Sequence, residues 1–300
     1  MPISYKNQRI TTKRETKMKK TLLALLSAAL LITVTQPAQA EDQKVLAIID
    51  TAIDSTKFTS IVYEACFSQN LSCPNKTNFM EGSGSASAVV WPKSVNDGTY
   101  HGDWMTKAAL KVDPNIKIVF VRFANVLPTG SSANRPEALI SAMDWVSKNA
   151  DKYSIDAVSI SQSAVDKINI GRCSTDKTVI NSVNSLASRN IPVFAATGNN
   201  GLSDVVGFPS CTTGVIGVGA LANNTAFEKA TNRGPGLDLV AFGKISITKY
   251  NGTQFDLSGT SGATVVSAAN YVSKNSSKNF QEYINSLPKI IINNVSYSFN

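Results

Sequence analysis

The chain alternates short, uniformly apolar runs with longer segments in which apolar and polar residues are mixed. The first run, residues 45–49, ends in Asp50 and has the composition of a strand that is buried on both faces. Similar runs occupy residues 116–123, 157–161, 191–196 and 215–218. These runs predict the strands of one buried sheet.

Segments with helical character lie between the runs, at residues 101–112, 135–149, 178–188 and from about Ser261 onward. This alternation predicts an α/β fold with a doubly wound, mainly parallel sheet that has helices on both faces. Near the C-terminal end we expect a helix over residues 278–287 and a final apolar strand over residues 290–299. Residues 82–88 contain only Gly, Ser and Ala, and we expect a surface loop there. No internal repeat or domain break is visible, so residues 41–300 are expected to form one domain.

The first forty residues have a different pattern. Lys19 and Lys20 precede an uncharged apolar run over residues 22–34, and Pro37–Ala40 forms a small-residue cleavage motif. This pattern predicts a bacterial secretory signal peptide that is removed after Ala40, with export to the periplasm or the exterior. Met18 begins a more typical signal peptide than Met1 does. The apolar run is too short for a transmembrane helix, so no membrane span is expected after cleavage.

The net charge of +8 belongs mostly to this leader. Residues 1–40 carry seven Lys or Arg and one Glu, a charge of +6, which leaves +2 for the remainder. The remainder therefore lacks the basic surface of a nucleic-acid-binding protein. No Gly-x-Gly-x-x-Gly motif follows the first strand, which disfavours a Rossmann-type nucleotide site.

Four cysteines follow the leader: Cys66, Cys73, Cys173 and Cys211. An even number in an exported protein predicts two disulfides. Three connectivities are possible, and the one that joins neighbours in sequence pairs Cys66 with Cys73 and Cys173 with Cys211. A zinc site is disfavoured because there is no Cys-x-x-Cys spacing and the chain has one histidine.

Polar residues with catalytic potential stand at the ends of the predicted strands and the starts of the predicted helices. Asp50, Ser161 and Asn199 follow strands, whereas His101 and Ser261 begin helices. Because functional groups gather at the carboxyl ends of parallel strands, these residues are expected to share one edge of the sheet. A serine at a helix N-terminus suits a reaction that develops an oxyanion, and His101 is the one histidine that could act as its base. An N-cap role for Thr260 or Ser261 is the structural alternative.

Four motifs together resemble the subtilases, the subtilisin-like serine proteases: residues 45–51, His101-Gly102, residues 195–201 and Ser258-Gly259-Thr260-Ser261. The resemblance extends from Val45 to Val272. It implies that Ser261 is the nucleophile, His101 the general base and acid, Asp50 the orienting carboxylate and Asn199 the side-chain donor to the oxyanion. By the same resemblance, Ser161, Gln162 and Ser163 would line the cleft for a polypeptide substrate, although the family usually has Ser-Leu-Gly at these positions.

The chain departs from the family pattern in ways that keep a second hypothesis open. Four local departures replace residues that are common in subtilases: Ala52, Asp103, Gly262 and the pair Val265-Val266. An inward-facing Asp103 would favour the imidazolium form of His101.

The chain also departs from the family in the length of its N-terminal segment. Asp50 lies ten residues past Ala40, which leaves no room for the family's usual pro-segment. We therefore expect unaided folding, a separate inhibitor or chaperone, or a weak enzyme. The alternative function is a catalytically degenerate subtilase fold that binds peptides or a partner. No cofactor is expected; structural calcium is common in the family, but no carboxylate-rich loop identifies a site.

Overall fold

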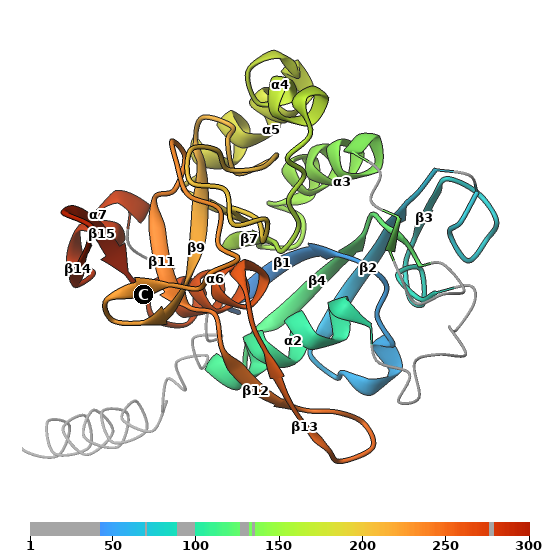
Figure 1. Cartoon of the computed structure of the whole chain (residues 1–300). Helices are drawn as coiled ribbons and strands as arrows, with labels where there is room; N and C mark the ends of the chain where they lie inside the picture. The colour runs from blue at the N-terminus through green and yellow to red at the C-terminus, as the bar shows by residue number, and fades with distance from the viewer. Residues whose placement is uncertain (1–42, 70, 89–99, 127–131, 134–135, 276–278) are drawn as a thin grey trace, which may run out of the picture. The chain divides into compact units, whose positions relative to one another are not determined.

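A computed structural model describes residues 43–69, 71–88, 100–126, 132–133, 136–275 and 279–300 (Figure 1). The predicted signal peptide, including Met18 and the cleavage motif at Ala40, lies outside these residues. The leader and the start of the mature domain therefore stay predictions.

The described residues form a mainly parallel sheet of eleven strands. In spatial order its strands are β14 (Lys289–Ile292), β15 (Val295–Phe299), β11 (Leu239–Phe242), β9 (Val215–Asn223), β8 (Val193–Ala196), β7 (Ala157–Ile160), β1 (Val45–Asp50), β4 (Lys117–Arg122), β2 (Ile61–Phe67) and β3 (Phe79–Glu81), with β10 (Ala226–Phe227) paired to β9. All neighbouring pairs from β15 to β2 are parallel, whereas β14, β10 and β3 are antiparallel to their partners. The predicted fold class is confirmed.

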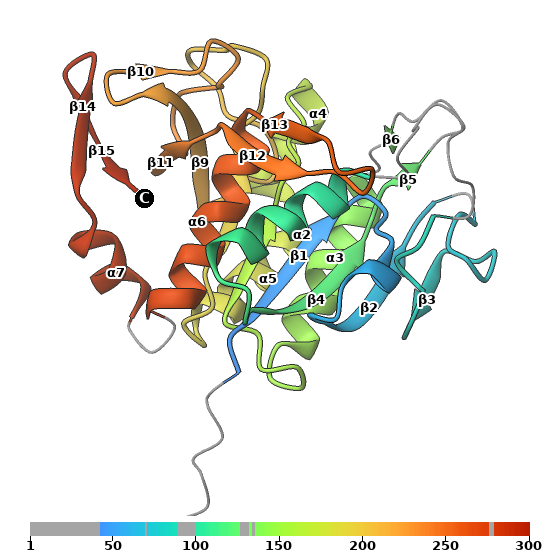
Figure 2. The ribbon, with the colours of Figure 1, turned by 90° about the horizontal axis from the view of Figure 1, so that it is seen from below.

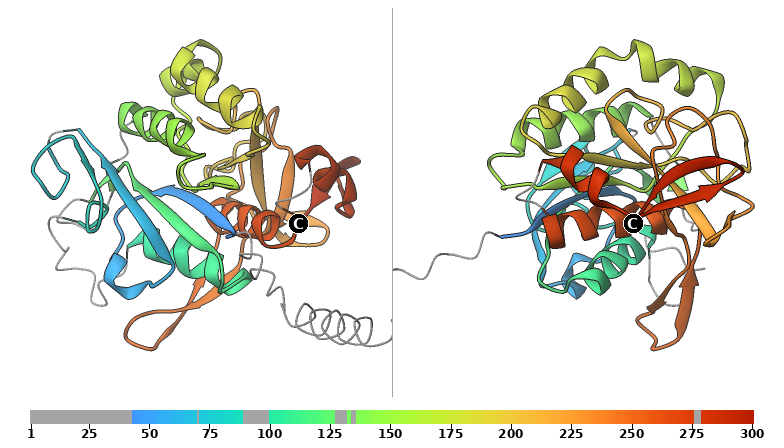
Figure 3. Two further views of the ribbon diagram at one scale, coloured as in Figure 1. Left: turned by 180° about the vertical axis from the view of Figure 1, so that it is seen from behind. Right: turned by 90° about the vertical axis from the view of Figure 1, so that its left-hand side faces the viewer.

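Helices cover both faces of this sheet (Figure 1). On one face lie α3 (Pro136–Asn149), α4 (Lys167–Thr175) and α5 (Lys177–Ala187), and on the other lie α2 (His101–Val112) and α6 (Thr260–Asn275). Figure 3 shows the same layers from two further directions. α7 (Phe280–Ser286) packs beside α6, where the rings of Tyr271 and Tyr283 lie 5.1 Å apart.

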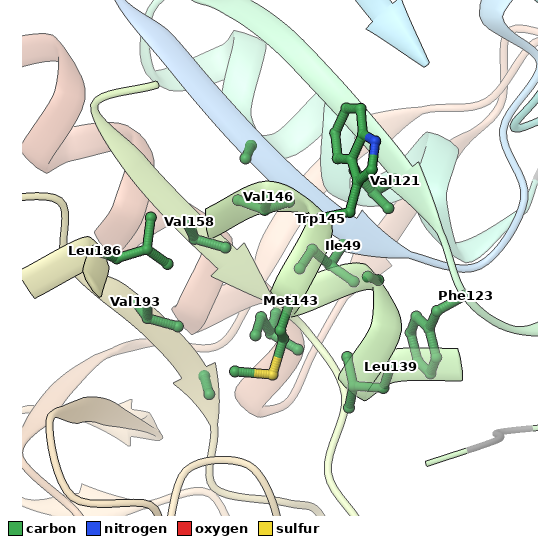
Figure 4. Close-up of a cluster of buried hydrophobic side chains, with 14 of the residues drawn as sticks. Ile49, Val121, Phe123, Leu139, Met143, Trp145, Val146, Val158, Leu186 and Val193 are labelled. Carbon is green, nitrogen blue, oxygen red and sulfur yellow. The ribbon is translucent and has the colours of Figure 1, made fainter. Parts of the chain in front are cut away.

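Strand β1 is buried along its whole length, which explains its uniformly apolar sequence. Alternate residues of the strand point to opposite faces. Ile49 packs with Leu139 and Met143 of α3 (Figure 4), whereas Leu46 and Ile48 pack with residues of α2 and α6. Each face of the central strand therefore has its own apolar core: one holds α3 against the sheet, and the other holds α2 and α6.

Among the described residues, two small strand pairs and one 3-10 turn lie outside the sheet. β12 (Ile245–Thr248) and β13 (Gln254–Leu257) form a hairpin beside α2 (Figure 2), and β5 (Asn125–Val126) pairs with β6 (Ser132–Ala133). A 3-10 turn, η1, spans Ser55–Lys57. Lys107 and Lys111 of α2 donate to the backbone carbonyls of Thr248 and Ser246, at 2.7 and 2.8 Å. These bonds fix the hairpin along the helix.

Two sequence-based expectations about the architecture were wrong. Residues 290–299 form the hairpin β14–β15 rather than one strand, and Asn293 and Asn294 make its turn with φ of 50° and 63°. Positive φ at both central residues is the requirement of a type I′ hairpin turn, which asparagine tolerates. Residues 82–88 are not a simple surface loop, because Ser85 and Ala86 are fully buried. The buried carboxylate of Glu64 accepts the backbone N–H groups of Gly84 and Ala86, at 2.9 and 3.1 Å, and so holds this segment against β2.

Two disulfides are present. Cys66–Cys73 joins β2 to the turn that follows it, and Cys173–Cys211 joins α4 to the segment before β9, with Cα atoms 5.9 and 5.6 Å apart. These are the pairs that are nearest in sequence. Within the part of the chain that the structure describes, no helix combines the length and apolar content needed to cross a membrane.

Candidate active site

Asp50 and His101 are in direct contact at the carboxyl edge of the sheet. A hydrogen bond of 2.7 Å joins Nδ1 of His101, the first residue of α2, to Oδ1 of Asp50, the last residue of β1. The carboxylate of Asp50 is fully buried, and the same oxygen accepts the Thr51 N–H at 2.6 Å. An ionised Asp50 makes Nδ1 the protonated nitrogen of a neutral His101, which leaves Nε2 as an acceptor.

The pKa of His101 lies above its ordinary value of 6.5. Burial by itself lowers this pKa, but the negative charge of Asp50 and the hydrogen bond from Nδ1 outweigh it. The imidazole side chain keeps 26% of its surface exposed. His101 is therefore a base of raised basicity that a ligand in the site can reach.

Gly102 allows helix α2 to approach β1 and β4 closely. A Cβ atom at this position would lie 2.5 Å from the ring of Phe120 and 2.7 Å from the carbonyl oxygen of Ala52. The Gly102 N–H also donates to the hydroxyl of Thr51 at 3.1 Å. The His-Gly pair thus has a steric reason: a larger residue after His101 would push the imidazole away from Asp50.

Ser261 lies in the first turn of α6, opposite the end of β7. Its hydroxyl donates to the carbonyl oxygen of Ser161 at 3.0 Å, and the hydroxyl of Ser161 donates to the carbonyl oxygen of Ser261 at 3.0 Å. This reciprocal pair fixes the start of the helix against the strand.

Ser261 and His101 line one pocket of about 310 Å³. The other residues that line it are Ser161, Gln162, Ser163, Ala196, Gly198, Asn199, Asn200 and Thr260. The structure therefore brings His101, Ser161, Gln162, Ser163, Asn199 and Ser261 to one pocket, with Asp50 behind the imidazole.

The side-chain amide of Asn199 is held in one orientation. Its Oδ1 accepts the backbone N–H and the hydroxyl of Thr260, at 3.0 and 3.1 Å. Because both acceptor bonds are made by this oxygen, the Nδ2 hydrogens face the other way and can donate to a ligand in the pocket. The sequence predicted a helix cap at Thr260 or Ser261, and the role of Thr260 in orienting Asn199 was not predicted.

Asn232 shapes the turn that carries Asn199, a role that was not predicted from the sequence. This fully buried side chain accepts the backbone N–H groups of Asn200 and Leu202, at 2.9 and 3.1 Å, and donates to the carbonyl oxygen of Thr197 at 3.1 Å. It therefore satisfies the backbone of the whole turn. Asn232 stands in no recognisable motif, so the sequence carries no signal for this role.

The sequence model of the subtilase family matches residues 42–283 of the chain. The chain belongs to the subtilase family. It is 30% identical over 191 residues to an alkaline protease of Alkalihalobacillus alcalophilus. The aligned region covers 60% of this chain and 46% of the relative. It is 29% identical over 191 residues to subtilisin Savinase of Lederbergia lenta, covering 60% and 65%. The chain thus matches about half to two thirds of the length of these relatives.

Solved structures show the same fold as this subtilase. A protease from Pseudoalteromonas arctica PAMC 21717 superposes with a TM-score of 0.63 at 16% identity, covering 85% of this chain and 86% of that one. A lanthipeptide protease superposes with a TM-score of 0.57 at 16% identity, covering 81% and 75%. At such identity the agreement concerns the arrangement of strands and helices.

Two residues that depart from the subtilase pattern have structural explanations. Asp103 does not face His101: its carboxylate accepts the backbone N–H groups of Tyr100 and Asp54, at 2.6 and 3.1 Å, and does not contribute to the raised pKa of the histidine. Gly262 lies in the first turn of α6, close to the backbone that follows β11. A Cβ atom there would lie 2.9 Å from the carbonyl oxygen of Gly243, so glycine permits close packing of the helix.

The described residues of this subtilase contain no group of three or more His, Cys, Asp or Glu side chains arranged to hold a metal ion.

Proposed function

We propose that this chain is a serine endopeptidase that hydrolyses peptide bonds through an acyl-enzyme. The observation that carries the proposal is the 2.7 Å contact between His101 and a buried Asp50, beside a helix-start serine in the same pocket. A serine hydroxyl needs a base to become a nucleophile, and a base of this kind needs a partner that holds its tautomer. Membership of the subtilase family supports the same chemistry.

In the proposed reaction, the hydroxyl of Ser261 exchanges its bond with Ser161 for one with Nε2 of His101. The oxygen then attacks the carbonyl carbon of the substrate while His101 accepts the proton. The oxyanion receives hydrogen bonds from Nδ2 of Asn199 and from the backbone N–H of Ser261, which has no partner inside the first turn of α6. His101 next protonates the leaving nitrogen, and water hydrolyses the ester by the reverse proton transfers.

A degenerate, peptide-binding subtilase is the second candidate. The observation that favours it is the hydroxyl of Ser261, which donates to Ser161 rather than to His101. While this bond is made, the hydroxyl proton faces a carbonyl oxygen, which is too weak a base to accept it, and not His101. A binding protein would still bind peptides but would not form a covalent adduct.

Covalent labelling by a fluorophosphonate separates these two candidates. We expect the purified protein to be labelled stoichiometrically, the Ser261→Ala variant not to be labelled, and a Ser188→Ala control in the exposed end of α5 to be labelled like the native chain. A folded native protein that binds peptides without reacting with the probe would favour the degenerate alternative.

We also propose that the protein acts outside the cytoplasm, in the periplasm or the exterior. The basic and apolar leader and the two disulfides support export, because disulfides persist in oxidising compartments. Mass spectrometry of the exported protein should give an N-terminus at Glu41. A separate inhibitor or chaperone stays part of this proposal and would co-purify with the exported enzyme.

A further inference from the structure

Ser163 fills a gap between two glycines at one end of the pocket. Its hydroxyl donates to the carbonyl oxygen of Thr197 at 3.1 Å. A Cβ atom added to Gly207 would collide with this oxygen, and one added to Gly198 would lie 2.9 Å from it. Gly198 and Gly207 have no side chains, and the Ser163 side chain therefore occupies the space beside them.

Ser163 and Gly198 line the same pocket as Ser261 and Asn199, and the proposed reaction directs a substrate side chain toward them. The attacked carbonyl carbon sits at Ser261 with its oxygen toward Asn199, and the leaving nitrogen sits toward His101, which protonates it. The side chain on the acyl side is carried by the Cα atom that is bonded to that carbonyl carbon. It must therefore point toward the remaining walls of the pocket, which include Ser163 and Gly198.

The walls around Ser163 are joined to one another. Ala164 and Phe208 exchange both of their backbone hydrogen bonds, at 2.9 and 2.8 Å, and Gly207 donates to the carbonyl oxygen of Thr197 at 2.9 Å. The Cys173–Cys211 disulfide adds a covalent connection just beyond these bonds. The pocket therefore cannot widen without breaking several bonds, so the size of residue 163 sets its depth.

We infer that Ser163 determines substrate specificity, and that the enzyme prefers Gly, Ala or Ser as the residue whose carbonyl is attacked. The inference rests on the proposed function, since it names the substrate class of the same site. Its physical basis is steric: a Leu or Phe side chain needs the volume that the Ser163 hydroxyl already occupies, and close-packed walls do not yield cheaply.

The test compares fluorogenic peptides that differ in one residue, Ala, Leu or Phe, at the acyl side of the cleaved bond. We expect the native enzyme to show its highest kcat/KM with Ala. In Ser163→Gly the ratio of kcat/KM for Phe over Ala should rise by roughly tenfold or more, the order expected from freeing space for one or two carbon atoms. Ser163→Ala should give a smaller rise, and Ser188→Gly, at the exposed end of α5, should leave the ratio unchanged.

A second variant keeps the test independent of how well Ser163→Gly folds. Ser163→Thr adds a methyl group, so kcat/KM for Ala should fall relative to Gly in the same peptide. Efficient cleavage after Phe by the native enzyme, or a ratio that no Ser163 variant moves, would overturn this inference while leaving the endopeptidase intact. Absence of hydrolysis together with absence of fluorophosphonate labelling would overturn the proposed function itself, and this inference with it.

Discussion

The phenol of Tyr250 donates a hydrogen bond of 2.8 Å to Oδ1 of Asp103 and so connects the β12–β13 hairpin to the helix that begins with His101. The same carboxylate accepts the N–H of Asp54, which follows Asp50 by four residues. Asp103 therefore joins the segment after Asp50, the start of α2 and the hairpin. Its burial raises the pKa of Asp103 to about 6, even though three hydrogen bonds act to lower it.

Removal of the Tyr250 hydroxyl should destabilise the protein in a pH-dependent way. At pH 8 Asp103 is ionised, and Tyr250→Phe should reduce the free energy of unfolding by about 2 kcal/mol, as expected for a buried hydrogen bond to a charged group. At pH 5 the carboxyl group is largely protonated, so the loss should be smaller. Urea unfolding at both pH values measures the difference, with Tyr297→Phe on the edge hairpin as the control. An equal loss at both pH values would contradict this account.

Asp103 itself should contribute a stability that grows as the pH falls. Its pKa is higher in the folded chain than the ordinary value of 3.8, so the folded state binds more protons between about pH 4 and pH 6. Protonation therefore favours folding across that range, and the contribution is lost as the pH rises through 6. In Asp103→Asn this part of the dependence should disappear from unfolding curves recorded between pH 4 and pH 8. A variant with the same pH dependence as the native chain would show that another group is responsible.

Hydrolysis should decline as the pH falls through the pKa of His101, because the protonated imidazole cannot accept the proton of Ser261. Asp50→Asn removes the charge that raises this pKa and should move it downward, since the lowering effect of burial remains. It should also reduce kcat on the order of 10⁴-fold, the loss found when the carboxylate of a serine-protease triad is removed. His101 is the single histidine of the chain, so one imidazole signal in an NMR titration reports the pKa without ambiguity. A pKa that rises or stays constant in the variant would refute the assigned role of Asp50.

Asn199→Asp should reduce kcat while leaving KM nearly unchanged. The aspartate can still accept both bonds from Thr260, but it replaces the Nδ2 donor by a negatively charged oxygen. Loss of one donor to the oxyanion costs about 10²–10³-fold in kcat. Steady-state kinetics should show this loss in Asn199→Asp and not in Asn224→Asp, which makes the same charge change on the exposed β9–β10 turn. Equal kcat values in the two variants would show that Asn199 does not stabilise the transition state.

The residues at strand ends and helix starts could be predicted because their signals are local. Asp50 ends an apolar run and His101 precedes a glycine, and the structure places both where the pattern indicates. The partners of Asp103 could not be predicted in this way, because Tyr250 is 147 residues distant and Asp54 is 49 residues distant. Such contacts depend on how loops meet after the helices pack on the sheet, and no periodicity in the sequence encodes them.

Amino-acid composition does not predict burial where the same residue types suit an exposed and a buried segment. The small residues at 82–88 fit an exposed loop and a tightly packed segment equally well, and the buried carboxylate of Glu64 determines which occurs. The turn at Asn293-Asn294 was a readable signal within residues 290–299, since asparagine tolerates positive φ. The apolar residues on both sides, at 290–292 and at 295, 297 and 299, concealed it.

The two disulfides should contribute unequally to stability, because they close loops of different length. Cys173 and Cys211 are 38 residues apart, whereas Cys66 and Cys73 are 7 residues apart. Loop-closure entropy then predicts losses of about 4 and about 2.5 kcal/mol in the free energy of unfolding when each pair is replaced by alanine. Urea unfolding of the two double variants measures this difference under oxidising conditions.

The Cys173→Ala/Cys211→Ala variant should also change specificity, because that disulfide connects α4, which follows Ser163, to the segment that follows Gly207. Loss of the covalent connection should raise the kcat/KM ratio for Phe over Ala, and less so than Ser163→Gly does. The Cys66→Ala/Cys73→Ala variant is the matched control: it loses a disulfide far along the sheet, beyond β4, and should keep the native ratio. A shift of equal size in both double variants would mean that general loss of stability, rather than separation of the pocket walls, relaxes the selection.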